Sequence, residues 1–175
     1  MPVRQGEAMD ISEVVEEVRS TWNTHNEILL YLLNSVPRAA LTALPAGSRG
    51  RDVVAQFAHV AKVRTGWLRY HLTGVRPSLG RYDKTRPPTK AELARELRES
   101  GDAVGRFLED ALTRDVKPRM FGRQALRWMG YLIAHESHHR GQIVLALKQS
   151  GVKLSQEVTL NGLWGKWIFG GRKSR

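Results

Sequence analysis

Residues 135–142 read His135-Glu136-Ser137-His138-His139-Arg140-Gly141-Gln142. On an α-helix, positions i and i+4 lie on one face about one turn apart, so His135 and His139 point the same way. Two imidazoles placed in this way suit one divalent metal ion, with Zn²⁺, Ni²⁺ and Fe²⁺ as the candidates. The stretch therefore predicts a long helix that carries two metal ligands.

The two histidines are expected to face the protein interior. Projecting residues 124–150 at about 100° per residue places His135 and His139 in an apolar stripe. The other members of the stripe are Trp128, Leu132, Ile143 and Ala146. Because burying an imidazole without a partner is unfavourable, we favour a metal site over a pair of hydrogen-bonded core histidines. His138 lies on the shoulder of the stripe and is expected to face the surface or to support the ligands.

Composition places the chain among single-domain proteins. Its 175 residues are enough to bury a core, and we expect one domain over 1–175 with flexible ends at 1–9 and 170–175. The absence of cysteine excludes disulfides, thiolate metal sites and cysteine nucleophiles. No stretch resembles a signal peptide or a membrane span, so we expect no membrane association and a cytoplasmic location.

The charge is strongly positive, with 28 Lys and Arg against 17 Asp and Glu and a formal net charge of +11. Residues 49–86 alone hold nine basic and two acidic side chains. Aromatic residues are not interleaved with these charges, so a surface that stacks on nucleic acid bases is not indicated. We expect a solvated basic surface that can attract an anionic small molecule, and no nucleic acid partner.

Apolar periodicity predicts four helices and no strand, which indicates an all-α bundle. The expected helices cover about 11–36, 52–72, 89–111 and 124–149. A short fifth helix, rich in aromatic residues, is expected to cap the bundle after Gly151. The link at 74–88 is long enough to let the second and third helices run parallel.

A third ligand is needed, because catalytic zinc usually takes three protein ligands and keeps one open position. The candidates are His25, His59 and His71. Periodicity places His71 nearer than His59 to the apolar centre of the second helix, and His25 lies on the apolar seam of the first. The residues alone leave this choice open.

Three segments together suggest a family. Residues 135–143 closely resemble the signature of the DinB-like (DinB/YfiT) metalloenzymes. Phe57-Ala58-His59-Val60, followed by Trp67, resembles the histidine segment on the second helix of that family, and Leu163-Trp164-Gly165-Lys166 resembles its C-terminal tryptophan motif. The likeness spans nearly the whole chain, and the histidine string is its most specific part.

The resemblance implies an up-down-down-up four-helix bundle, usually a homodimer, with one divalent metal ion. Carried over by position, the metal ligands are His59, His135 and His139, with His25 as the next choice if His59 is not one. The family implies a metal-dependent transferase or hydrolase of small molecules, with a low-molecular-weight, anionic thiol as a cosubstrate. Glu136 flanks the predicted metal face and is our candidate for a catalytic base.

Two other functions fit parts of the sequence. His135 to His139 satisfies the H-E-x-x-H pattern of zinc proteases, and Glu157 would then be the third ligand. The extended protease motif and an upstream strand region are missing, which argues against this hypothesis. The non-enzymatic alternative is a basic stress-response or binding module whose metal site is structural or vestigial.

Overall fold

Reciprocal capping boxes start two of the helices. The Asp10 side chain accepts a hydrogen bond from the Glu13 backbone N–H, and the Glu13 carboxylate accepts one from the Asp10 backbone N–H. α1 (Ile11–Ser35) follows this capping box. Thr89 and Glu92 form the same arrangement before α3 (Lys90–Thr113). Each box satisfies backbone N–H groups that have no partner within the helix. Both starts agree with the predicted boundaries.

The structure is a computed structural model and describes residues 10–76, 83 and 85–170. Besides α1 and α3, the long helices are α2 (Val53–Thr73) and α4 (Ala125–Gln149). Short turns of 3-10 helix, η1 (Arg38–Ala40) and η2 (Phe121–Arg123), precede α2 and α4. The chain continues into a π-helical segment, η3 (Glu157–Trp164), and α5 (Gly165–Phe169).

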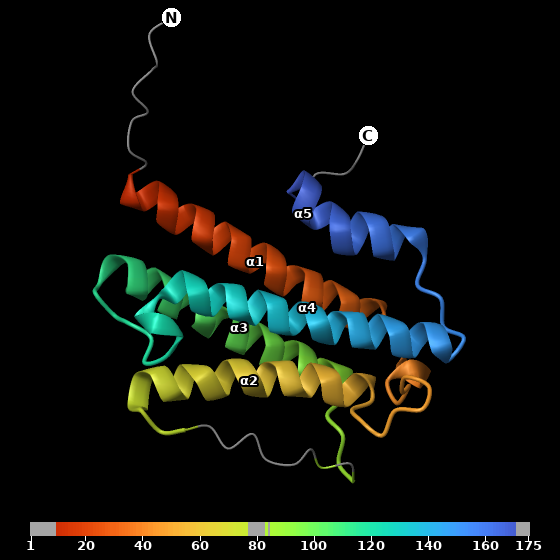
Figure 1. The fold of residues 1–175 in the computed structure, drawn as a ribbon. Helices are drawn as coiled ribbons and strands as arrows, with labels where there is room; N and C mark the ends of the chain where they lie inside the picture. Colours follow the sequence, from red (N-terminus) through yellow and green to blue (C-terminus); the bar gives the residue numbers. More distant parts are fainter. Residues whose placement is uncertain (1–9, 77–82, 84, 171–175) are drawn as a thin grey trace, which may run out of the picture.

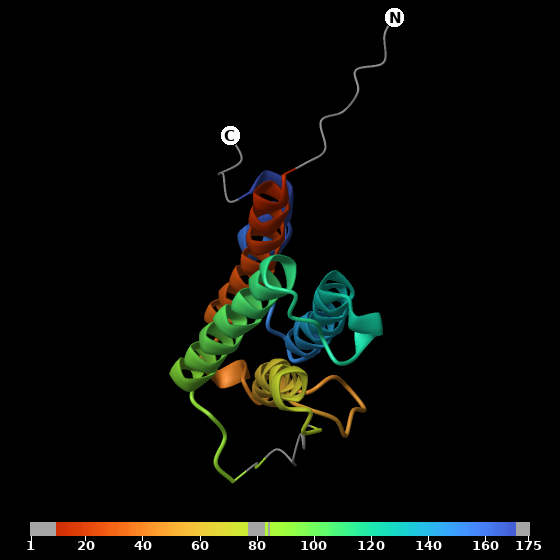
Figure 2. The same cartoon turned by 90° about the vertical axis from the view of Figure 1, so that its left-hand side faces the viewer.

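The direction of the long helices gives an up-down-down-up bundle (Figure 1). α1 and α4 run one way, and α2 and α3 run the other. α1 packs on α3 and α2 packs on both α3 and α4 (Figure 2). The predicted all-α bundle and the parallel second and third helices are therefore confirmed, and the long link before α3 makes this topology possible.

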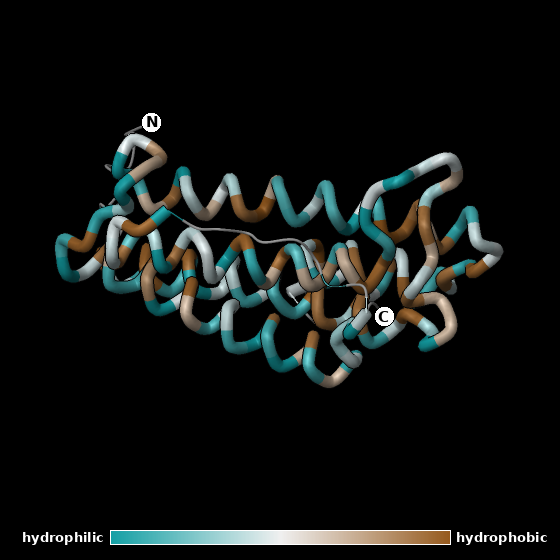
Figure 3. Tube along the Cα trace, turned by 90° about the horizontal axis from the view of Figure 1, so that it is seen from below, coloured by the Kyte–Doolittle hydropathy of each residue, from teal (hydrophilic) through white to brown (hydrophobic). Residues whose placement is uncertain are grey.

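Hydrophobic and hydrophilic residues alternate along each helix, as expected for amphipathic helices (Figure 3). The buried apolar residues form two clusters, one toward each end of the bundle. On α1, for example, Trp22 belongs to one cluster and Leu29 to the other, and the buried polar residues His25 and Asn26 lie between them. A polar layer therefore crosses the middle of the bundle.

The C-terminal segment differs from the expectation in its position. It lies along the side of α1 instead of covering an end of the bundle (Figure 1). Gly162 allows this contact, because a Cβ at that position would overlap the ring of Tyr31. The Lys166 ammonium group also lies 2.9 Å from the Glu27 carboxylate. Side-chain contacts with α1 thus determine where the segment packs.

The expected flexible ends lie outside the described residues, except for Gly170, which ends α5 in a left-handed conformation. Within the part of the chain that the structure describes, no helix combines the length and apolar composition needed to cross a bilayer.

Gly101 lies in the contact of α3 with α1, and its carbonyl accepts a 2.7 Å hydrogen bond from the Trp22 indole N–H. A Cβ at Gly101 would overlap the Asn26 side chain. We expect Gly101→Ala to lower the free energy of unfolding by about 1–3 kcal/mol, because a packed core resists added volume. The measurement is chemical denaturation at equilibrium.

Gly130 is the matched control, because it is also helical but a Cβ there meets no atom within 4 Å. We expect Gly130→Ala to stabilise the protein by up to about 1 kcal/mol through helix propensity. Equal effects of the two substitutions would contradict the close contact of α1 with α3.

Candidate metal centre

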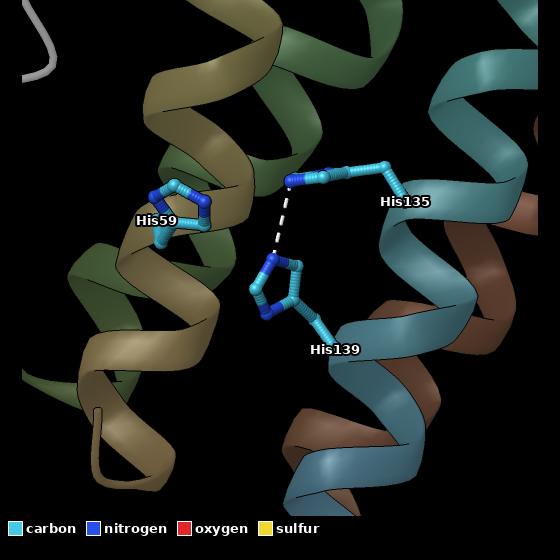
Figure 4. A group of neighbouring side chains, drawn as sticks. All are labelled: His59, His135 and His139. Atoms are coloured by element: carbon cyan, nitrogen blue, oxygen red, sulfur yellow. Dashed lines mark hydrogen bonds between the residues drawn. The ribbon is translucent and has the colours of Figure 1, made fainter. Parts of the chain in front are cut away.

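Three histidines converge between α2 and α4. His59 comes from α2, and His135 and His139 come from α4, one turn apart (Figure 4). The imidazole rings of His59 and His139 are 4.8 Å apart between centroids, and those of His135 and His139 are 4.5 Å apart. One nitrogen from each ring lies within 4.8 Å of the other two. The i, i+4 spacing therefore places both α4 histidines on one face, as the sequence predicted, and in the structure this face meets α2.

The donor set fits a divalent ion. Zinc binds imidazole nitrogen at about 2.0–2.1 Å, so two nitrogens of a tetrahedral site lie roughly 3.3 Å apart. The Nε2 atoms of His135 and His139 are 3.1 Å apart. Three neutral imidazoles leave one position of a tetrahedron for a water molecule or a substrate. The three residues can therefore supply the protein ligands of such a site, which the sequence expected for zinc, nickel or iron.

The electrostatic environment keeps the histidines neutral. Burial, followed by the charge of Arg51, lowers the pKa of His59 to about 4. Burial and the neighbouring His135 and His59 lower the pKa of His139 to about 3. The pKa of His135 is also lowered, mainly by burial. At neutral pH each ring thus offers an unprotonated nitrogen.

Gln56 orients His139. Its side-chain oxygen accepts a 2.5 Å hydrogen bond from Nδ1–H of His139, and this contact leaves Nε2 as the lone-pair nitrogen that faces His135. The Gln56 amide nitrogen in turn donates to the Arg51 carbonyl, which fixes the direction of the amide. A metal-binding histidine commonly has such a partner on its other nitrogen.

We expect Gln56→Ala to weaken metal binding roughly 10- to 100-fold, because the His139 ring loses the contact that fixes its tautomer and rotation. Gln56→Glu keeps an acceptor at the same place and should retain most of the affinity. Competition with a chromophoric chelator measures both constants. An alanine variant that binds metal as tightly as the wild type would show that Gln56 does not orient the ligand.

The lowered pKa values predict how metal binding depends on pH. Three histidines with ordinary pKa values would lose affinity on the order of 50-fold between pH 8 and pH 6, because protons would compete for the ring nitrogens. With pKa values of about 4 for His59 and about 3 for His139, we expect a nearly constant affinity over that range and release only toward pH 4. A steep loss between pH 7 and pH 6, measured by chelator competition, would contradict this.

A family model covers the part of the chain that holds the three histidines. The model of the DinB superfamily matches residues 21–143, a range that includes His59, His135 and His139. The chain belongs to the DinB superfamily. The matched range ends before residues 163–166, so it does not cover the segment that resembles the C-terminal tryptophan motif of the family. No curated protein matches this DinB-superfamily chain.

The other candidate ligands lie elsewhere. His25 is buried and its Nε2 lies 2.8 Å from a carboxylate oxygen of Glu136. His71 is buried among aromatic rings, and its Nδ1 accepts from the Arg119 backbone N–H. His138 is exposed. Glu157 is exposed on η3, and its carboxylate accepts a hydrogen bond from the Asn161 side chain. Among the described residues, only His59 completes a cluster with the two histidines of α4.

Glu136 faces away from the histidines, into the bundle. Its side chain is fully buried, and both carboxylate oxygens accept from Arg64, at 2.7 and 2.6 Å. Burial alone would raise its pKa, but the charge and hydrogen bonds of Arg64, together with His25, lower the pKa to about 2. With both oxygens engaged, Glu136 has the geometry of a structural ion pair, and its role as a base stays a prediction.

Arg64 extends this ion pair into a network across the bundle. Its Nη1 donates to the Asn26 side chain at 2.7 Å and to the Leu97 carbonyl at 3.0 Å. The guanidinium also lies over the Trp22 ring, 4.9 Å from the centroid. α1, α2, α3 and α4 each contribute to this polar layer. Because Glu136 is next to His135 and Arg64 is on the helix of His59, the network fixes the two helices that carry the histidines.

Proposed function

We propose that this DinB-superfamily protein is a metal-dependent transferase or hydrolase of small molecules that uses a low-molecular-weight thiol as a cosubstrate. The observation that carries the proposal is the convergence of three neutral imidazoles, a set that leaves one position of a tetrahedral metal ion for a further ligand. A divalent ion, whether zinc, nickel or iron, supplies Lewis-acid chemistry, because it lowers the pKa of a thiol or a water molecule at its open position.

Basic side chains near the histidines favour an anionic thiol. Arg51 is exposed, and its charge contributes to the lowered pKa of each of the three histidines. Lys62 is also exposed and acts on His59. Because the imidazoles are neutral, a bound divalent ion keeps its full charge, and the two basic residues add to it. The potential therefore attracts an anion to the open side of the site.

Cobalt substitution tests the proposal directly. The chain contains no cysteine, so a thiolate-to-cobalt charge-transfer band in the Co²⁺ protein can only come from an added thiol. We expect such a band with mercaptoacetate and its loss in His59→Ala. Lys153→Ala, exposed beyond the C-terminal end of α4 and not part of the histidine cluster, is the control that should keep the band. A Co²⁺ protein that shows no band at any thiol concentration would reject thiol activation.

The two alternatives receive less support. A protease of the H-E-x-x-H type needs Glu136 to face the metal, whereas this carboxylate is bound by Arg64. A non-catalytic binding module requires no open coordination position, and the three-histidine set provides one. The cobalt experiment separates this module from an enzyme, because only an open position binds the added thiol.

A homodimer and a cytoplasmic location belong to the same proposal. A homodimer is supported by large apolar side chains that are exposed on the C-terminal segment. They are Leu160, Trp164, Ile168 and Phe169. Sedimentation of Trp164→Ser/Ile168→Ser tests the homodimer, since a dimer held by this face should dissociate.

The cytoplasmic location is supported by the proposed thiol cosubstrate, which stays reduced there.

A further inference from the structure

A separate pocket of about 280 Å³ lies at the C-terminal end of α2. Its lining residues are Trp67, Tyr70, Arg76 and Met120. Among these described residues, three are apolar or aromatic, one is a cation, and none is acidic. Small-molecule sites are typically apolar with a few polar groups that orient the ligand, and this volume suits one small ligand.

Aromatic rings connect the pocket to the metal centre. Tyr131 stacks on the metal-ligand candidate His135, with 5.7 Å between ring centroids. Tyr131 also meets Trp67 at 6.0 Å, and Trp67 meets Tyr70 at 6.0 Å, both edge to face. Two ring contacts thus separate the pocket wall from His135.

The loop before α4 is held in an unusual conformation beside the pocket. Phe121 and Arg123 have positive φ angles of 58° and 61°, which bulky L-residues rarely adopt. Phe121 packs edge to face on Trp67 at 4.9 Å, and Arg119 donates to the His71 carbonyl at the end of α2. Strain of this kind persists where surrounding contacts impose it, and it is concentrated at ligand sites. The loop thereby places Met120 on the pocket.

Arg76 supplies the charge of the pocket. It is exposed, just beyond the end of α2, and it is the one charged residue among the described residues that line the pocket. A guanidinium beside aromatic walls suits a flat apolar body that carries a carboxylate. The geometry points to an aromatic carboxylate as the ligand: the ring packs against Trp67 and Tyr70, and the carboxylate pairs with Arg76.

This inference names the substrate class of the proposed function, and only the role of the ligand as a substrate rests on that function. Binding of the ligand in the pocket does not depend on it. The pocket places the aromatic carboxylate two ring contacts away from His135, one of the three histidines of the cluster. None of the three histidines lines the pocket, so the ligand can be tested with and without metal.

The experiment is titration calorimetry of 2-naphthoate into the zinc-loaded and the metal-free protein. We expect 2-naphthoate to bind to both forms. Neutral 2-naphthalenemethanol should bind more weakly, by a factor of up to about 5, since one partly exposed charge pair contributes modestly. Arg76→Gln should weaken 2-naphthoate binding by the same factor and leave the neutral analogue unchanged. Arg69→Gln, exposed on α2 and outside the pocket, should change neither.

Met120→Trp tests the position of the ligand, because its larger side chain should fill the pocket and block both compounds. Absence of 2-naphthoate binding, equal binding of the neutral analogue, or full binding in Met120→Trp with a native circular dichroism spectrum would overturn the inference. Metal content measured in the same samples keeps the proposals apart. A protein without metal affinity that binds 2-naphthoate through Arg76 would reject the proposed function and support the pocket.

Discussion

His135→Ala/His139→Ala should abolish stoichiometric metal binding. Purified without a metal-affinity tag, the wild type should hold about one divalent ion per chain, because three neutral imidazoles converge on one point. Removal of two of the three should lower the affinity on the order of 100-fold or more, since one imidazole holds a metal ion only weakly. Elemental analysis and chelator competition measure the two quantities.

His138→Ala is the matched control for this double substitution. It removes an imidazole from the same helix, but His138 is exposed and is not part of the cluster. We expect the control to keep one ion per chain. A double variant that retains the metal would refute the assignment of the α4 histidines, and loss of metal in the control would show that the site extends to His138.

Metal should also stabilise the wild type selectively. A ligand that binds only the folded state adds about 2.7 kcal/mol when its free concentration is 100 times its dissociation constant. The double variant should show no shift in thermal midpoint on adding zinc, whereas the wild type and His138→Ala should. This readout is independent of activity, so it tests the site without knowledge of the substrate.

The fold was predictable because local signals agree with the global arrangement. Asp10 and Thr89 each form the capping box that the sequence indicated, and the apolar stripe of α4 faces inward. Strong periodicity over more than twenty residues leaves little choice of helix face. The C-terminal segment lacks such periodicity. Its position depends on contacts of Gly162 and Lys166 with α1, and these become visible only after the bundle is assembled.

The third histidine of the cluster was not predictable from periodicity. α2 packs against both α3 and α4, so its buried surface is broad and has no single centre. His59 lies at one edge of this surface, facing α4, whereas His71 lies deeper among aromatic rings. Helix rotation is a property of tertiary packing, so the residues alone could not rank them. The family resemblance selected the histidine that the structure places beside His135 and His139.

The polar layer was missed for a related reason. A helical projection treats a charged residue as exposed, so it did not pair Arg64 with Glu136. Two signals pointed to a buried layer: Arg64 interrupts a strongly apolar helix, and His25 lies on the apolar seam of α1. Neither signal identifies the partner, since Arg64 and Glu136 are far apart in the sequence and meet only when α2 packs near α4.

Arg64→Met should be strongly destabilising. It leaves the fully buried Glu136 carboxylate without its bidentate partner, and an unpaired buried charge costs about 3–5 kcal/mol. Asn26 and the Leu97 carbonyl lose their donor as well. Total stability for a domain is about 5–15 kcal/mol, so this variant is best measured in the presence of metal or at low temperature. Equilibrium denaturation in urea gives the value.

Arg64→Met/Glu136→Leu should recover part of that loss, because removing both charges leaves no unpaired ion. We expect the double variant to be more stable than Arg64→Met, with a coupling of about 1–3 kcal/mol in the double-mutant cycle. Arg95→Met, whose partner Glu99 is exposed, should change stability by less than about 1 kcal/mol and serves as the surface control. Additive effects of the two core substitutions would show that Arg64 and Glu136 do not act as a pair.

The pH dependence gives a second, independent test of this pair. The pKa of Glu136 is lowered to about 2 in the folded protein, below the ordinary value of 4.5. Because the unfolded chain takes up the proton first, the contribution of this carboxylate is fully present above about pH 4.5 and is lost as the pH falls toward 2. Glu136→Gln should therefore flatten the stability profile in that window. If the same variant keeps its metal and its turnover, Glu136 stabilises the bundle and is not the catalytic base.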